Sequence, residues 1–128
     1  MSKTLLIADD ELHIRALLEQ TLEDLEDEGV DILIAANGQE AIDLIQAEQP
    51  DLVFLDVMMP KLNGYEVCQK AKHELNLSDT FIVLLTAKGQ EADQQKGYAA
   101  GADIYMTKPF DPDEVLAKAE EILGLAVA

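Results

Sequence analysis

The sequence predicts an α/β fold in which a doubly wound, five-stranded parallel sheet carries five helices on its two faces. Short apolar segments and helical patterns alternate five times along the 128 residues. The apolar segments lack polar alternation, as expected for strands buried on both faces. Short connections favour right-handed crossovers with helices on both sides of the sheet. The length predicts a single domain, residues 1–128.

The first half of the chain is expected to form two strand–helix units. The strands cover Thr4–Ala8 and Asp31–Ala36. The first helix ends at Gly29, and the second is broken by Gln49 and Pro50. Apolar residues at helical spacing define the helices: Ile14, Leu17, Leu18, Leu22 and Leu25 in the first, and Ala41, Ile42 and Ile45 in the second.

Three further units follow the second helix. Their strands are expected over Leu52–Leu55, Phe81–Leu85 and Ile104–Met106. Residues 58–64 contain proline and glycine and predict a loop. The helices are expected over about residues 65–75, over about residues 90–100, and after Asp111 and Pro112, an N-cap followed by proline in the first turn.

The charge of the chain excludes some partners. Its 26 acidic and 9 basic residues give a formal net charge of −17. Such a surface repels nucleic acid phosphates and anionic lipid. We therefore expect no direct nucleic acid binding and no membrane binding, and any action on DNA would need another chain or domain.

Several features suit the cytoplasm. The apolar runs are too short to cross a membrane. Met1-Ser2-Lys3 leads directly into the first strand, and we expect no signal peptide.

The one cysteine, Cys68, is expected to be an apolar helix residue. His13 and His73 are expected to face solvent, because neither has a second ligand at helical spacing.

Polar side chains stand at the carboxyl ends of four predicted strands. They are Asp9, Asp10, Asp56, Thr86 and Lys108. Ligands of open parallel sheets bind outside these strand ends, so the five groups should converge on one edge. Three carboxylates repel one another unless a cation sits among them, and Mg²⁺ prefers such ligands. One carboxylate could instead act as a nucleophile, and the whole set is typical of phosphoryl transfer.

Each of these residues also has a simpler interpretation. Asp9 or Asp10 could cap a helix, and Asp56 could be a turn residue. Thr86 could be a β-branched strand end, and Lys108 an exposed loop residue. Their joint placement at four strand ends favours the functional interpretation.

The chain resembles the receiver domain of two-component response regulators. The resemblance covers nearly the whole chain and implies a flavodoxin-like fold with strand order 2-1-3-4-5, in which the first and third strands are neighbours. The segments that carry it, in the family's order, are Leu5–Glu11, Pro50–Pro60, Asn63–Glu66, Leu84–Ala87, Gly101–Asp103 and Lys108–Phe110.

The resemblance implies a phosphoacceptor and a Mg²⁺ site. Asp56 is the expected phosphoacceptor and also a metal ligand. Asp10 is expected to bind the metal directly, Asp9 through water, and Met58 through its backbone carbonyl. Met58 and Lys88 occupy the two variable positions that tune the lifetime of the phosphoryl group in this family.

The resemblance also implies a switch. Thr86 would hydrogen-bond the phosphoryl group, and Lys108 would pair with it, positioned by a cis bond to Pro109. Tyr105 occupies the aromatic switch position and is expected to turn inward when Thr86 moves. The signal would leave through the face formed by the fourth helix, the fifth strand and the fifth helix.

The function implied is phosphorylation-dependent signalling. A histidine kinase or a histidine phosphotransfer protein would donate the phosphoryl group, and the domain would catalyse only its own phosphorylation and dephosphorylation. The effector is unknown and no effector is expected within the chain. The last helix has no arginine to complete the charge network of many dimerising relatives, and we expect a monomer before phosphorylation.

Two other functions are compatible with the fold class. A metal-dependent phosphatase of the haloacid dehalogenase class also forms an aspartyl-phosphate, but it needs an acid two residues after its nucleophile, where Met58 stands. A flavodoxin needs a phosphate-binding loop after the first strand, where Asp9 and Asp10 would repel the flavin phosphate.

Overall fold

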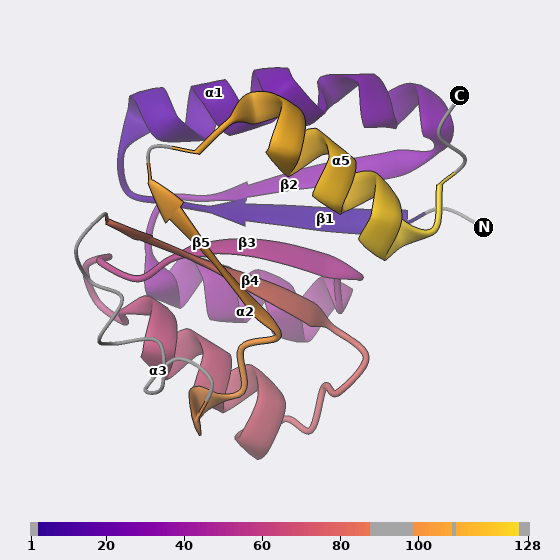
Figure 1. The fold of residues 1–128 in the computed structure, drawn as a ribbon. Helices are drawn as coiled ribbons and strands as arrows, with labels where there is room; N and C mark the ends of the chain where they lie inside the picture. Colours follow the sequence, from indigo (N-terminus) through magenta and orange to yellow (C-terminus); the bar gives the residue numbers. More distant parts are fainter. Residues whose placement is uncertain (1–2, 88–98, 109, 126–128) are drawn as a thin grey trace.

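A computed structural model describes residues 3–87, 99–108 and 110–125, and places five parallel strands between two layers of helices (Figure 1). The strand order is β2-β1-β3-β4-β5, as the resemblance implies. Crossovers therefore run to both sides of β1. The strands are β1 (Lys3–Ala8), β2 (Val30–Ala35), β3 (Leu52–Asp56), β4 (Phe81–Ala87) and β5 (Ile104–Lys108).

Helices cover both faces of the sheet. In Figure 1, α1 and α5 lie over one face and α2 and α3 over the other. The predicted helix at about residues 90–100 falls almost entirely outside the described residues, where only residues 99–100 are helical. Lys88 and Pro109 also lie outside them. The described helices are α1 (Leu12–Leu22), α2 (Gly38–Glu48), α3 (Gly64–Gln69) and α5 (Pro112–Leu123).

Two apolar clusters, one on each face of the sheet, form the core. Side chains of β1 alternate between them, with Leu5 on the α1 and α5 side and Leu6 on the α2 and α3 side, both fully buried. This burial of both faces explains the continuous apolar run of the strand. Cys68 is buried in the cluster on the α2 and α3 side. Burial raises the pKa of its thiol to about 12, as expected for a residue with an apolar role.

The first helical segment is less regular than predicted. Gly29 ends it in the left-handed conformation at φ 86°, as expected, but the α-helix stops at Leu22 and a 3₁₀ turn spans Glu23–Glu28. Five of these six residues are acidic, and negative charge is unfavourable near a helix carboxyl end. The predicted apolar stripe was wrong at Leu17, whose exposed fraction is 39%.

β4 and β5 each extend two residues beyond the predicted strand end, and this difference matters for the site. The last residues of β4 and β5 pair with one another, Thr86 with Thr107 and Ala87 with Lys108. Thr86 and Lys108 therefore belong to the strands, where sheet pairing fixes their backbone. The third helix also ends differently, because a π-helical turn over Lys70–Glu74 follows α3.

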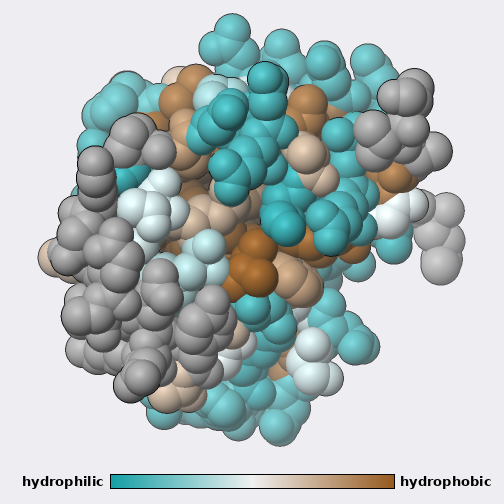
Figure 2. Space-filling view, in the orientation of Figure 1, coloured by the Kyte–Doolittle hydropathy of each residue, from teal (hydrophilic) through white to brown (hydrophobic). Residues whose placement is uncertain are grey.

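The surface over the helices is mostly hydrophilic. Figure 2 shows apolar residues gathered in a band between the two helix layers, at the sheet edge to which β5 belongs. Two residues of that strand, Ile104 and Tyr105, are half-buried. No helix within the described part of the chain is long and apolar enough to cross a membrane.

Candidate functional site

Three carboxylates meet at the carboxyl ends of β1 and β3. Asp9 follows β1 and Asp56 ends β3, and these neighbouring strands are in register, with Ala8 opposite Leu55. A carboxylate oxygen from each of Asp9, Asp10 and Asp56 lies within 4.8 Å of the other two. Asp9 is fully buried, Asp56 is 5% exposed and Asp10 is exposed. The cluster predicted from the strand ends is therefore present.

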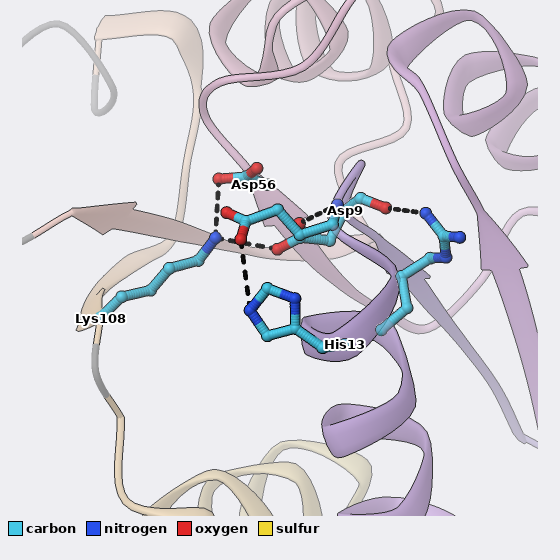
Figure 3. Close-up of polar contacts among 6 residues, drawn as sticks. Asp9, His13, Asp56 and Lys108 are labelled. Atoms are coloured by element: carbon cyan, nitrogen blue, oxygen red, sulfur yellow. Dashed lines mark hydrogen bonds and ion pairs between the residues drawn. The ribbon is translucent and has the colours of Figure 1, made fainter.

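Lys108 joins this cluster from β5. Its ammonium Nζ donates to Asp9 Oδ2 at 2.9 Å and to Asp56 Oδ1 at 3.1 Å. In Figure 3 the lysine side chain reaches across from its strand and its nitrogen lies between the two carboxylates. Its side chain is only 17% exposed. The simpler interpretation of Lys108 as an exposed loop residue was therefore wrong.

Two residues of the site, Asp56 and Lys108, have shifted pKa values. Burial, reinforced by the negative charge of Asp9, raises the pKa of Asp56 from 3.8 to about 7, although the Lys108 ammonium opposes the rise. Burial lowers the pKa of Lys108. The hydrogen bond to Asp9 and the charges of Asp56 and Asp9 outweigh that effect, so the net pKa lies above its ordinary value of 10.5.

Asp9 is held firmly at the start of α1. Its Oδ1 accepts a hydrogen bond from the Glu11 backbone N–H at 2.9 Å. Its backbone N–H donates to the Ala35 carbonyl at 3.2 Å, and Arg15 Nη1 donates to its carbonyl at 2.8 Å. Asp9 thus satisfies a backbone donor before the helix and also faces the cluster. The N-cap residue of α1 is Glu11 and no side chain caps this helix end, so the interpretation of Asp9 as a helix cap was wrong; its role as a metal ligand stays a prediction.

The loop after Asp56 is fixed by the first turn of α3. The Gly64 N–H donates to the Val57 carbonyl at 2.8 Å. A Cβ on Gly64 would lie 2.5 Å from the Asp56 carbonyl oxygen, so only glycine permits this approach. Asn63 and Glu66 form a capping box that starts the helix. Met58 lies in this loop with its side chain 65% exposed.

The two predicted switch residues lie in β4 and β5. Thr86 is 1% exposed and follows Leu85, the residue paired with Asp56 in the sheet. Tyr105 is half-buried, and its hydroxyl lies 2.8 Å from the hydroxyl of Tyr65 on α3, in a hydrogen bond. This hydrogen bond links Tyr105 on β5 to α3.

The histidines are exposed, as predicted. His13 lies beside the cluster in Figure 3, and its Nε2 pairs with Glu11 Oε2 at 3.4 Å. His73 is exposed on the π-helical turn after α3.

Sequence reasoning missed two residues of the site region. Arg15 is the one arginine of the chain and lies one turn into α1, which was a usable signal. Tyr65 directly follows Gly64 in a segment that carried the resemblance, but its contact with Tyr105 spans 40 positions and no local pattern reveals it.

The donor set fits a small, hard divalent cation. All three clustered ligands are carboxylates, and among the four charged side chains of Asp9, Asp10, Asp56 and Lys108 two negative charges stay uncompensated when the acids are ionised. Mg²⁺ prefers such oxygen ligands and retains positions for water or phosphate oxygens.

Comparisons with known proteins agree with this geometry. The response regulator receiver domain profile matches residues 5–120. The chain is 45% identical to the alkaline phosphatase synthesis transcriptional regulatory protein PhoP of Bacillus subtilis, over 96% of this chain and 49% of that protein. The chain thus spans about half the length of the curated relatives it matches.

Solved structures show the same fold. The BeF3-activated DrrB receiver domain superposes with a TM-score of 0.83 at 31% identity, covering 97% of this chain and 99% of that one. The chemotaxis response regulator CheY4 of Vibrio cholerae gives a TM-score of 0.82 at 30% identity, covering 95% and 99%.

Proposed function

The chain belongs to the response regulator receiver domain family of two-component systems, and from this premise we propose that Asp56 accepts a phosphoryl group from a histidine of a partner kinase or phosphotransfer protein. The observation that carries the proposal is the position of Asp56. It lies 5% exposed at a strand end, grouped with two carboxylates and bonded to one ammonium. That arrangement matches the charge requirements of phosphoryl transfer.

The reaction follows from these contacts. An ionised oxygen of Asp56 attacks the phosphorus of a phosphohistidine, and the new O–P bond forms as the N–P bond breaks. The electron pair of the broken bond stays on the donor imidazole. Lys108 already donates to Asp56, so its ammonium is placed to neutralise oxygens of the arriving group. Later attack by water releases phosphate and restores the carboxylate.

A Mg²⁺ ion is the proposed cofactor. Asp9, Asp10, Asp56 and the Met58 carbonyl would hold it. When bound, it supplies charge neutralisation for the phosphoryl oxygens. The protein's own part is to keep Asp9 oriented through Glu11 and to keep Asp56 among its partners.

The proposed switch uses Thr86 and Tyr105. A phosphoryl group on Asp56 would attract the Thr86 hydroxyl, and Tyr105 would favour an inward position against the core. A ligand shifts such an equilibrium only through contacts that differ between the two states. The output face would include β5 and α5. The roles of Met58 and Lys88 in lifetime, and of Pro109 in positioning Lys108, stay predictions.

We propose that partners other than nucleic acid read this face. The acidic charge of −17 disfavours direct contact with phosphate backbones. PhoP of Bacillus subtilis is a transcriptional regulatory protein, and any comparable action here would run through another domain or chain. The monomeric state and the cytoplasmic location stay predictions from the sequence.

A phosphorylation assay tests the proposal. Acetyl phosphate with Mg²⁺ should add one acid-stable, base-labile phosphoryl group, located at Asp56 by peptide mapping. Asp56→Asn should abolish it, whereas Asp51→Asn, which changes an acid at the opposite end of β3, should not. An adduct on another residue, or undiminished labelling of Asp56→Asn, contradicts the assignment.

A further inference from the structure

A pair of tyrosines connects the first turn of α3 to β5. The Tyr65 and Tyr105 hydroxyls lie 2.8 Å apart. Both side chains are half-buried and pack against the apolar cluster on the α2 and α3 side of the sheet. We call this place of the Tyr105 ring the inner position. A hydrogen bond at that distance between two partly desolvated hydroxyls favours the geometry that forms it.

The Tyr65 end of this pair is tied to the site. Tyr65 follows Gly64, whose N–H donates to the Val57 carbonyl at 2.8 Å. Val57 directly follows Asp56, and its own N–H donates to the Leu85 carbonyl at 3.1 Å. The backbone that supports Tyr65 is thus the backbone that supports Asp56. The position of the Tyr65 hydroxyl is set by the same short segment that shapes the site.

The Tyr105 end belongs to the other half of the switch. Tyr105 pairs with Leu84 in the sheet, two residues before Thr86, and lies three residues before Lys108. A ring on this strand can leave the core without breaking backbone pairing, because only its side-chain torsions must change. The apolar packing of the ring and its hydroxyl contact with Tyr65 both favour the inward place.

We propose that Tyr65 is a positioning residue that holds Tyr105 in the inner position and thereby strengthens binding of a phosphoryl group at Asp56. This inference rests on the proposed function, in which the phosphoryl-bound state favours an inward Tyr105. Coupling between two sites is reciprocal. A hydroxyl that stabilises the inner position must therefore raise the affinity of the site for the group that also favours it.

The size of the effect follows from one neutral hydrogen bond. Losing such a bond shifts an equilibrium by about two- to tenfold. Because phosphoryl binding draws only part of its free energy from this shift, tenfold is the upper end for Tyr65→Phe. The substitution keeps the aromatic ring and its packing, so it removes the hydroxyl contact with little other change.

A double-mutant cycle tests the inference. The dissociation constant for beryllofluoride, a phosphoryl mimic, is measured with Mg²⁺ in the wild type, Tyr65→Phe, Tyr105→Phe and the double variant. We expect Tyr65→Phe to weaken binding about two- to tenfold in the wild-type background and to have no further effect when Tyr105 is already phenylalanine. The Tyr105 ring signals should also move toward a solvent-exposed environment in Tyr65→Phe.

The outcomes of this cycle distinguish failure of the Tyr65 role from failure of the proposed phosphoryl site at Asp56. Unchanged or tighter beryllofluoride binding by Tyr65→Phe, or equal weakening in both backgrounds, overturns the positioning role while the phosphoryl site stands. A wild-type chain that does not bind beryllofluoride at all overturns both proposals. Thermal unfolding of each variant shows whether folding itself has changed, and the ring signals give a readout that general destabilisation does not move.

Discussion

The proposed role of Asp56 needs an ionised carboxylate, but its burial in the folded chain disfavours the charged form. Asp56 is buried beside Asp9, and the single ammonium of Lys108 is shared between the two carboxylates. The result is the pKa of about 7. At neutral pH, roughly half of the metal-free molecules therefore hold a proton on the proposed nucleophile. Binding of the proposed cation and ionisation of the Asp56 carboxyl group should therefore be coupled.

The stability of the metal-free chain should depend on pH through Asp56. The folded chain keeps its proton up to about pH 7, whereas the unfolded chain loses it near 3.8. Rising pH therefore lowers stability between these values. Asp56→Asn removes this loss. We expect the variant to be more stable than the wild type by roughly 1–3 kcal/mol at pH 8 and equally stable at pH 4.

Urea unfolding in the presence of a chelator measures this difference. The gain is smaller than the full pKa shift implies, because asparagine presents a weaker acceptor to Lys108. Asp43→Asn, which changes an exposed acid on α2, serves as the control and should show no such pH dependence. A constant difference between Asp56→Asn and the wild type across the whole pH range would falsify the prediction.

Mg²⁺ binding should show the opposite trend with pH. A proton on Asp56 competes with the cation, so affinity should rise about tenfold between pH 6 and pH 8 and level off above. Asp10→Asn should weaken binding most, because the exposed Asp10 is the proposed direct ligand. Amide spectra recorded during a Mg²⁺ titration measure both effects. No response at millimolar Mg²⁺ contradicts the cation site.

At the scale of elements, the junction between β3 and α3 determines the shape of the site. The Gly64 N–H bonds the Val57 carbonyl, the capping box starts the helix, and the missing Cβ lets the helix start lie on the Asp56 backbone. The proposed carbonyl ligand, Met58, lies between these fixed points. The junction therefore transmits any change at the helix start to the acid cluster.

Gly64→Ala tests this dependence. The new Cβ would lie 2.5 Å from the Asp56 carbonyl oxygen and 2.9 Å from the Val57 Cα, so the backbone must shift. We expect a loss of about 1–3 kcal/mol of stability together with weaker Mg²⁺ binding. Gly29→Ala is the matched control, because its Cβ meets nothing within 4 Å and its strain is confined to a left-handed φ of 86°. It should lower stability without changing Mg²⁺ affinity.

The sequence predicted the elements well and their ends less well. Apolar runs located all five strands, because burial on both faces leaves a strong local pattern. Pairing between β4 and β5 then extended both strands by two residues, a tertiary effect that no local pattern contains. The predicted first helix continues beyond Leu22 only as a 3₁₀ turn over Glu23–Glu28, where acidic side chains disfavour a continuous α-helix. The spacing of apolar residues, from which the helix was predicted, takes no account of charge.

At the scale of the whole molecule, the dominant property is the net charge of −17. Like charges on a compact chain repel one another and oppose folding. Unfolding separates them and relieves that repulsion. The acid cluster of the site adds three carboxylates close together. Repulsion within the cluster therefore opposes folding in the same way as the net negative charge of the whole chain.

Salt should therefore stabilise this protein. Raising NaCl from about 0.01 to 0.3 M shortens the screening length, and the free energy of unfolding should rise on the order of 1 kcal/mol. Asp27→Lys, which reverses an exposed charge in the acidic 3₁₀ turn, should reduce the salt dependence. Chemical unfolding by urea at each salt concentration measures it. A stability that falls with salt contradicts the dominance of repulsion.

The site was predictable only as a set. Asp9, Asp10, Asp56 and Lys108 could be grouped from the sequence because parallel strands place their carboxyl ends at one edge. Their distances, and the sharing of Lys108 between two acids, depend on side-chain directions that the sequence does not specify. Tyr65 was missed because its hydroxyl contacts a tyrosine 40 positions away. Arg15 was missed because it contacts the backbone carbonyl of Asp9, a group that every residue carries.

The Lys108 to Asp9 hydrogen bond joins residues 99 positions apart, so the site can close only after β5 has been synthesised. A ribosome-bound chain that has exposed Asp9 and Asp56 still lacks the lysine and the strand that carries it. Such a chain holds the acids without the Lys108 ammonium that offsets part of their charge. Under the proposed function, phosphorylation of Asp56 would therefore require β5 to be in place, and a chain without this strand would not be phosphorylated efficiently.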